Sequence, residues 1–237
     1  MKHKILILES QHGNEYSGER LHNHIEHHHP NLLSNITFLV ANPRARRQKK
    51  RYTESDMNRS YTGNKDTYEE RRAVKILKTI TEGHYDLVLD MHTTPTDQAP
   101  CLIMASVNAK NIGFLQASSF SNIVTINNAI VNNSINGALP HAISVEINNQ
   151  ITDEVLELIC EDIDRFLRGQ ISDNQKYVYE VTELLDKSDI TEVEAKKLRN
   201  FSKSKFGYYP IMVGENSYQD FTNYLGFKAY NRYEFKV

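Results

Sequence analysis

Short runs of aliphatic residues alternate with longer amphipathic segments along most of the chain. The aliphatic stretches at residues 5–8 and 86–91 are typical of strands that are buried on both faces of a parallel sheet. Further strands are predicted by similar runs at residues 35–40, 101–105, 123–126 and 142–147. Helical segments separate several of these strands. This alternation predicts an α/β fold with a mixed, mostly parallel sheet that is sandwiched by helices.

Helical periodicity fills several of the intervals between these strands. Apolar residues spaced three and four apart predict helices at about 16–29, 66–82 and 152–167, and a shorter helical segment near 111–119. Pro30 stands where the first of these patterns ends, as expected of a residue that cannot continue a helix.

The character of the chain changes near position 170. Residues 169–175 have the composition of a loop, and the sequence beyond them is rich in tyrosine, with strand-like stretches at 177–183 and 208–213. A chain of 237 residues can bury one sizeable core and carry a small second unit. We therefore predict a larger first domain at residues 1–169 and a small β-containing domain at residues 170–237.

Composition and charge exclude some classes of partner. The 28 basic and 30 acidic side chains give a formal net charge of −2, so overall charge indicates no nucleic-acid partner and no membrane partner. No apolar run approaches the roughly 18 residues that span a bilayer, and the first run is too short for a signal peptide. The two cysteines lack motif spacing. We expect a cytoplasmic protein with reduced thiols, and its oligomeric state is left open.

Residues that can ligate a metal follow two of the predicted strands. His12 and Glu15 lie just beyond the first strand, and Gly13 lets the backbone turn tightly between them. His92 ends the aliphatic run at 86–91. Because the carboxyl ends of parallel strands meet at one edge of a sheet, we expect these side chains to lie close together. Two histidines and one carboxylate are a common ligand set of catalytic zinc.

A second polar cluster has the residue types of a substrate-binding site. Guanidinium groups bind carboxylates bidentately and stay charged. We expect Arg59 to hold a substrate carboxylate, Asn58 to add a hydrogen bond and Arg51 to polarise a carbonyl. Asp56 is expected to orient one of these groups. A surface ion-pair network is an equally weighted alternative. The basic run at 44–51 is expected to be a loop beside an anion site, because it lacks interleaved aromatic residues.

Two further residues are candidates for the same site. Glu146 lies near the end of the strand predicted at 142–147, where a carboxylate could take a proton from metal-activated water and pass it to a leaving amine. Tyr218 follows a later strand and could reach back to the site, with an exposed aromatic residue as the equally weighted alternative.

A group of histidines also invites a metal interpretation. Consecutive residues point in different directions around a helix, so a solvated helix end is the favoured interpretation. The histidines are His22, His24, His27, His28 and His29.

Ordered motifs along the chain resemble the aspartoacylase and succinylglutamate desuccinylase family of zinc carboxypeptidase-like hydrolases. The resemblance covers nearly the whole chain. Its motifs are HGNE at 12–15, NPRA at 42–45, RY at 51–52, DMNR at 56–59, YEERRA at 68–73, DMHTT at 90–94, VEI at 145–147 with Gln150, and YPIMVGENSY at 209–218.

The resemblance implies a zinc-dependent amidohydrolase that cleaves the amide bond of a small N-acyl amino acid, with the first domain as the zinc carboxypeptidase-like catalytic domain. It implies one zinc ion per chain on His12, Glu15 and His92, acid/base chemistry by Glu146, carbonyl polarisation by Arg51, carboxylate recognition by Asn58 and Arg59, and a substrate contact from Tyr218.

Two departures from the family pattern bear on the substrate. In the family pattern that this chain resembles, a relative carries a carboxylate-binding arginine ten residues before the catalytic glutamate, where this chain has Asn136. The glycine and proline that follow the glutamate strand are replaced by Asn148 and Asn149. Two alternatives therefore remain, a zinc carboxypeptidase-like peptidase or amidase on longer substrates, and a catalytically weak zinc- or ligand-binding protein.

Overall fold

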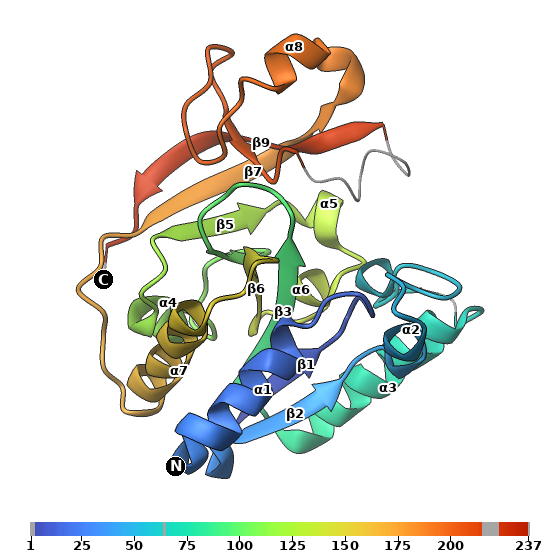
Figure 1. Cartoon of the computed structure of the whole chain (residues 1–237), viewed down its shortest axis with the longest axis vertical. Helices are drawn as coiled ribbons and strands as arrows, with labels where there is room; N and C mark the ends of the chain where they lie inside the picture. The colour runs from blue at the N-terminus through green and yellow to red at the C-terminus, as the bar shows by residue number, and fades with distance from the viewer. Residues whose placement is uncertain (1–2, 64, 215–222, 237) are drawn as a thin grey trace.

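In the computed structural model, the described residues, 3–63, 65–214 and 223–236, form one nine-stranded sheet in the order β2-β1-β3-β6-β4-β5-β7-β9-β8 (Figure 1). The strands are β1 (Ile5–Glu9), β2 (Ile36–Val40), β3 (Leu87–Thr94), β4 (Cys101–Met104), β5 (Asn122–Ile126), β6 (Ala142–Asn148), β7 (Tyr177–Asp186), β8 (Tyr209–Ile211) and β9 (Tyr224–Glu234).

Helices and short helical turns connect these strands. The α-helices are α1 (Ser17–His28), α2 (Pro43–Gln48), α3 (Tyr68–Gly83), α4 (Ile112–Ala117), α5 (Asn128–Val131), α6 (Ile135–Ala138), α7 (Asp153–Leu167) and α8 (Glu192–Ala195). The 3-10 turns are η1 (Pro30–Ser34), η2 (Met57–Arg59) and η3 (Lys187–Asp189). No helix within the described residues is both long enough and apolar enough to cross a membrane.

Most neighbouring strands of the sheet run parallel. Strand β1 pairs in parallel with β2 and β3, β3 with β6, and β5 with β4 and β7. Antiparallel pairs join β4 to β6, β7 to β9, and β9 to β8. The predicted fold class, a mixed and mostly parallel sheet with helices on its faces, is confirmed.

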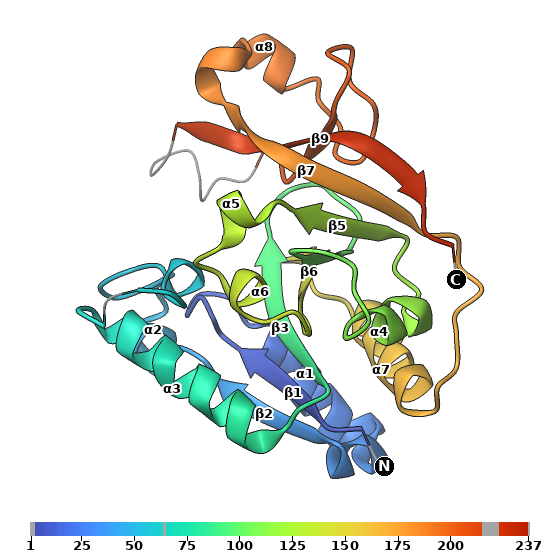
Figure 2. The ribbon, with the colours of Figure 1, turned by 180° about the vertical axis from the view of Figure 1, so that it is seen from behind.

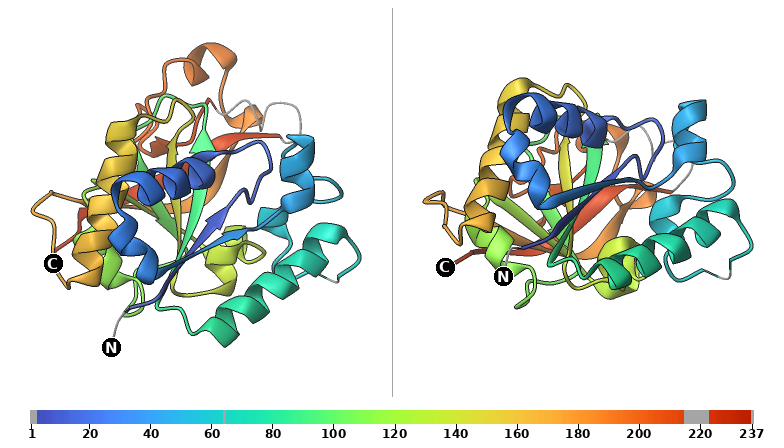
Figure 3. Two further views of the ribbon diagram at one scale, coloured as in Figure 1. Left: turned by 60° about the horizontal axis from the view of Figure 1, so that its bottom comes forward. Right: turned by 90° about the horizontal axis from the view of Figure 1, so that it is seen from below.

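Two layers of helices bury opposite faces of the first part of the sheet. Ile5 and Ile7 of β1 pack toward α1, α4 and α7, whereas Leu6 and Leu8 pack toward α3. Figure 2 shows α3 from behind, and the right-hand view of Figure 3 shows the sheet between α1 and α3. Since successive side chains of a strand point to opposite faces, burial of both faces requires the unbroken aliphatic run seen in the sequence.

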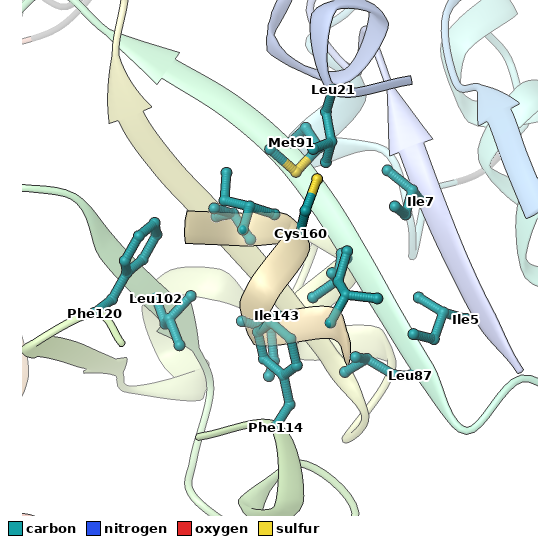
Figure 4. Close-up of a cluster of buried hydrophobic side chains, with 14 of the residues drawn as sticks. Ile5, Ile7, Leu21, Leu87, Met91, Leu102, Phe114, Phe120, Ile143 and Cys160 are labelled. Atoms are coloured by element: carbon teal, nitrogen blue, oxygen red, sulfur yellow. The ribbon is translucent and has the colours of Figure 1, made fainter. Parts of the chain in front are cut away.

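The two longest helices begin with side-chain caps. Thr67 and Glu70 form a capping box at the start of α3, and the Thr152 side chain accepts a hydrogen bond from the Val155 amide at the start of α7. Helix α7 then buries Leu156, Ile159, Cys160 and Ile163 against the sheet, in the cluster drawn in Figure 4. Burial of each aliphatic side chain contributes about 1.5–3 kcal/mol, so these helices are held mainly by their apolar faces.

The basic segment at 44–51, expected to be a loop, is helical from 44 to 48, so the prediction was wrong for that part, and residues 49–51 lie outside the helix. Helix α2 begins at Pro43, and the Asn42 side chain accepts a hydrogen bond from the Ala45 amide. Proline disfavours helix at the residue before it, but its fixed φ suits the first helical position. The helix ends at Gln48, and the next residue, Lys49, has a left-handed φ of 54°.

The C-terminal part of the chain extends the same sheet. Strand β7 pairs with β5, and β9 and β8 follow at the edge. The sequence indicated β7 and β8 but not β9. The division into domains at residues 1–169 and 170–237 stays a prediction.

Candidate active site

The polar turn after β1 packs against the start of α2. The Gly13 amide donates a hydrogen bond to the Arg51 carbonyl at 3.1 Å, and the Glu15 amide donates to the His12 carbonyl, also at 3.1 Å. A Cβ atom at Gly13 would lie 2.1 Å from the carbonyl carbon of Ala45. Glycine is therefore required at this position because the backbones of the two segments touch.

His12, Glu15 and His92 meet at the edge of the sheet where β1 and β3 end. One ligand atom from each of the three lies within 4.8 Å of the other two, and all three residues are buried. The Glu15 carboxylate lies between the rings, with Oε1 at 2.7 Å from Nδ1 of His12 and Oε2 at 2.9 Å from Nδ1 of His92. The structure thus brings the three predicted ligands together.

A second carboxylate contacts the outer nitrogen of each histidine. Asp56 Oδ1 lies 3.1 Å from Nε2 of His12, and Asp90 Oδ2 lies 2.7 Å from Nε2 of His92. Histidines that bind metals usually donate their other N–H group to such a partner, which sets the tautomer and orients the ring. With Nε2 protonated, the Nδ1 lone pairs of both rings point to the Glu15 carboxylate. The residues present therefore fit a zinc ion.

The charged groups of this cluster strongly affect one another's pKa values. Burial raises the pKa of Glu15, but the neighbouring His12 and His92 outweigh it and hold that pKa well below its usual range. Burial lowers the pKa of His92, but the charges of Asp90 and Glu15 outweigh it and raise that pKa well above its usual value. Negative charge from three carboxylates therefore surrounds the two imidazoles, an environment that favours a cation.

Asp90 is itself held by a buried hydrogen-bond network. Its Oδ2 accepts from Gln11 Nε2 at 2.7 Å and from Ser144 Oγ at 3.3 Å. Tyr61 donates to Gln11 at 2.6 Å, and Asn136 donates from Nδ2 to Ser144 Oγ at 2.8 Å. Asp90, Gln11 and Tyr61 were not among the site residues predicted from the sequence. The spacing of Asp90 and His92, two apart on one face of a strand, was the available signal for Asp90.

Glu69 organises the segment that carries the predicted substrate-binding residues. This buried side chain of α3 accepts hydrogen bonds from the amide and hydroxyl of Thr53 at 2.8 and 2.7 Å, and from the amides of Glu54 and Ser55 at 3.2 Å. Burial raises the pKa of Glu69, and these bonds outweigh it and lower the pKa below its usual value. This role of Glu69 was not predicted from the sequence, because its partners lie 14 to 16 residues away.

Arg51, Asn58 and Arg59 lie on the wall of a cleft above the histidines. Arg51 Nε donates to Asp56 Oδ2 at 3.2 Å, and its Nη1 lies 3.8 Å from Glu15 Oε1. Arg59 is exposed and donates to the Asn58 carbonyl at 2.8 Å. Among the described residues, the buried Oδ1 atom of Asn58 has no hydrogen-bond partner. The structure therefore places the predicted polar cluster beside the three candidate ligands.

Glu146 also lines this cleft, whose empty volume is about 650 Å³ including its open mouth. It is buried on β6, directly opposite His92 in the parallel pairing of β3 and β6. The remainder of the described lining is mixed, with six apolar residues, Ile103, Ile126, Ile130, Val131, Met212 and Phe227, and four polar ones, Thr93, Ser134, Asn136 and Ser144. The prediction for Tyr218 lies outside the described residues.

Relatives by sequence share part of the chain. A probable aspartoacylase from Trichodesmium erythraeum is 31% identical over 122 residues, which cover 46% of this chain and 41% of the relative. An N-acyl-aromatic-L-amino acid amidohydrolase (carboxylate-forming) from Homo sapiens is 32% identical over 119 residues, which cover 44% and 37%. The matched part thus spans about two fifths of the length of these relatives.

Solved structures share the fold at low sequence identity. Murine aminoacylase 3 superposes with a TM-score of 0.71 and 19% identity, over 98% of this chain and 96% of that chain. Succinylglutamate desuccinylase from Chromobacterium violaceum superposes with a TM-score of 0.72 and 14% identity, over 100% and 86%. The family model of the succinylglutamate desuccinylase/aspartoacylase catalytic domain matches residues 2–169, well over half of the chain. The chain therefore belongs to the succinylglutamate desuccinylase/aspartoacylase family.

Proposed function

We propose that the protein is a zinc-dependent amidohydrolase that cleaves the amide bond of N-acyl amino acids. The observation that carries this proposal is the convergence of His12, Glu15 and His92 at the base of a cleft, with carboxylates on the outer nitrogens of both histidines. Membership of the family supports it, as does the similarity to a human protein named as an N-acyl-aromatic-L-amino acid amidohydrolase.

In this proposal His12, Glu15 and His92 hold one zinc ion. Zinc in such a site acidifies water and polarises a carbonyl group. Glu146 takes the proton from the attacking water on a carboxylate oxygen and delivers it to the nitrogen of the departing amine. Its burial and its position opposite His92 support this role. Asp56 and Asp90 keep the two imidazoles oriented during the reaction.

The proposed substrate docks through its free carboxylate. Arg59 and Asn58 receive that carboxylate at the rim of the cleft, and Arg51, anchored by Asp56, polarises the scissile carbonyl. The unpartnered Oδ1 of Asn58 supports a ligand contact, since an amide turned by 180° would present its NH₂ donors there. A contact from Tyr218 remains part of the proposal on the strength of the family resemblance.

The six apolar and four uncharged polar residues in the rest of the lining favour a neutral side chain or acyl group over a second carboxylate. Among the described residues that line the cleft, the arginines are Arg51 and Arg59, which the proposal assigns to the carbonyl and the first carboxylate. Asn136, which stands where a relative has a carboxylate-binding arginine, donates instead to Ser144 within the Asp90 network. We therefore propose N-acyl derivatives of apolar amino acids as the preferred substrates.

A panel of amides tests this proposal. Purified protein would be assayed for metal content and for amine release from N-acetylphenylalanine, other neutral N-acyl amino acids, N-acetylaspartate, N-succinylglutamate and short peptides. One zinc per chain, chelator-sensitive release and a preference for neutral N-acyl amino acids are expected. Faster cleavage of peptides would contradict the substrate assignment in favour of a peptidase. Stoichiometric zinc without release from any compound would favour a binding protein.

A further inference from the structure

A second group of metal-ligating side chains lies between α1 and α7, apart from the cleft. One ligand atom each from His24, His29 and Cys160 lies within 4.8 Å of the other two. The Nε2 atoms of both histidines also approach the same oxygen of Glu157, at 3.1 Å for His24 and 2.9 Å for His29. The Glu157 carboxylate therefore borders the two imidazoles, beside the three-residue group that also contains Cys160.

The packing of the two helices fixes this arrangement. Leu21 and Ile25 of α1 are fully buried in the core cluster that also contains Cys160 of α7. His24 follows Leu21 by three residues and so lies on a neighbouring face of α1. His29 is held at the end of α1 by a 2.9 Å hydrogen bond from its amide to the Ile25 carbonyl.

Cys160 and Glu157 are positioned on one face of α7. They are three residues apart, the spacing of helical neighbours. The sequence interpretation of a solvated helix end suits His27, which is exposed and whose Nδ1 lies 2.6 Å from the Asn23 carbonyl oxygen. The interpretation of a solvated helix end does not describe His24 and His29.

The solvent exposure of the side chains in this group increases from Cys160, in the core, to Glu157, at the surface. Cys160 is fully buried beside Met91 and Leu21 (Figure 4), the side chain of His24 is 10% exposed, and that of Glu157 is 44% exposed. His29 and Cys160 also line a surface hollow. That hollow, whose lining also includes Glu161 and Asp164, offers an ion a route from solvent toward Cys160.

We propose that His24, His29, Cys160 and Glu157 form a second metal site, which binds a borderline transition-metal ion of the Zn²⁺ class and joins the end of α1 to α7. Two imidazoles, a thiolate and a carboxylate are established zinc ligands, and the thiolate selects against Mg²⁺ and Ca²⁺. The group lies outside the cleft and is built on two helices, so the site is structural rather than catalytic.

When a metal ion binds at this site, one proton is released. Burial, with smaller contributions from Glu157 and Glu161, raises the pKa of the Cys160 thiol to about 12. The thiol is therefore protonated at neutral pH in the absence of metal. The ion takes the sulfur lone pair, the S–H proton passes to solvent, and the two imidazoles bind as neutral ligands.

Cobalt titration of the full-length, metal-free protein tests the site, because a thiolate bound to Co²⁺ gives a strong charge-transfer absorption that histidine and carboxylate ligands do not give. The candidate active-site ligands contain no sulfur. We expect the wild-type protein to bind two ions per chain and to show this band. The C160S variant and the H24Q/H29Q double variant are expected to lose the band and one ion. The H12Q variant is expected to lose the other ion and keep the band.

Matched controls separate this site from incidental binding. H27Q changes a neighbouring exposed histidine, and C101S changes the cysteine that lies opposite Glu146 in the sheet, so both variants should keep the band. C160A supplies a second replacement of the buried thiol with no polar group to bury. A band that survives in folded C160S and C160A, or cobalt binding by the wild-type protein with no band, would overturn the proposal. A wild-type protein that binds one ion with the band would uphold this site and contradict the proposed active-site metal.

Discussion

The two histidine clusters of this protein use similar residues in different settings. At the active-site candidate, one buried carboxylate lies between two imidazoles, and Asp56 and Asp90 contact their outer nitrogens. Between α1 and α7, one exposed carboxylate receives both imidazoles, and His24 also contacts the rings of His28 and His29. The first cluster is therefore oriented by a surrounding network, and the second depends on helix packing.

This difference teaches what separates a catalytic cluster from a structural one. The active-site candidate opens into a cleft lined by two arginines, two asparagines and a buried glutamate, so a ligand in the cleft can reach the three candidate metal ligands. The helical cluster has a sulfur at its buried end and solvent at the other. Preorganised ligands beside a cleft favour chemistry, whereas a ligand set shared between two helices favours stabilisation.

Replacing a candidate catalytic ligand should have the largest effect. We expect H92Q to lose bound zinc and to reduce kcat/KM by at least about a thousandfold, because activation of water by the metal supplies much of the rate enhancement. The matched H24Q/H29Q variant should keep kcat/KM within about twofold, since those residues lie outside the cleft. Equal losses of kcat/KM in the two variants would remove the distinction between the clusters. Steady-state kinetics with zinc analysis measures both.

Replacing a carboxylate that contacts the outer nitrogen of a histidine should have the next largest effect. We expect D90N to weaken zinc binding by about 10- to 100-fold, because Asp90 orients His92 and increases its basicity. D97N is the matched control, since Asp97 is exposed in the loop after β3. Competition with a chromogenic chelator gives the affinities. A D90N protein that binds zinc like the wild type would show that the network does not tune the site.

Glu69 should affect stability and substrate binding more than zinc binding. We expect E69Q to lower the free energy of unfolding by about 1–3 kcal/mol, because buried amide donors lose a charged acceptor. E82Q is the matched control on an exposed position of the same helix. Denaturant unfolding measures the change. If E69Q weakened zinc binding as much as D90N does, Glu69 would not have a role separate from that of Asp90.

The pH dependence of stability has a defined sign for Glu69. Its pKa is lower in the folded protein than its ordinary value of 4.5, so its contribution to stability is fully present above that value and is lost as the pH falls through the folded pKa. The difference in unfolding free energy between the wild type and E69Q should therefore shrink on acidification below about pH 4.5. A difference that grows with acid would contradict this assignment.

Replacing Tyr61 should have the smallest effect on zinc binding. We expect Y61F to weaken zinc binding by about two- to fivefold, because the hydroxyl acts on His92 only through Gln11 and Asp90. Y85F is a control on a partly buried tyrosine that packs on the same face of the sheet. Isothermal titration with zinc would resolve a difference of this size. A loss as large as that in D90N would mean that Tyr61 determines the position of Asp90.

The sequence predicted the sheet and the three candidate ligands because local patterns determine them. The aliphatic runs of β1 and β3 define buried parallel strands, and parallel strands deliver His12 and His92 to one edge. Prediction failed for elements whose structure depends on tertiary contacts. Helix α2 depends on its Asn42 cap and on packing against Gly13. Strand β9 mixes polar and apolar residues and is held between β7 and the short edge strand β8.

The supporting residues of the site were harder to predict for a related reason. Asp56 was expected to orient a neighbour, and it lies against both Arg51 and His12. The roles of Gln11 and Glu69 depend on which groups approach them from segments 79 and 14 to 16 residues away. Hydrogen-bond partners at such separations follow from the packed structure and have no periodic signal in the sequence.

The most direct test of the proposed chemistry is the turnover of zinc-loaded E146Q. Glutamine preserves the shape of Glu146 but cannot accept and return the proton. We predict zinc content equal to that of the wild type and a kcat for N-acetylphenylalanine that is lower by about 100- to 10,000-fold. Wild-type turnover by E146Q at full zinc occupancy would contradict the account.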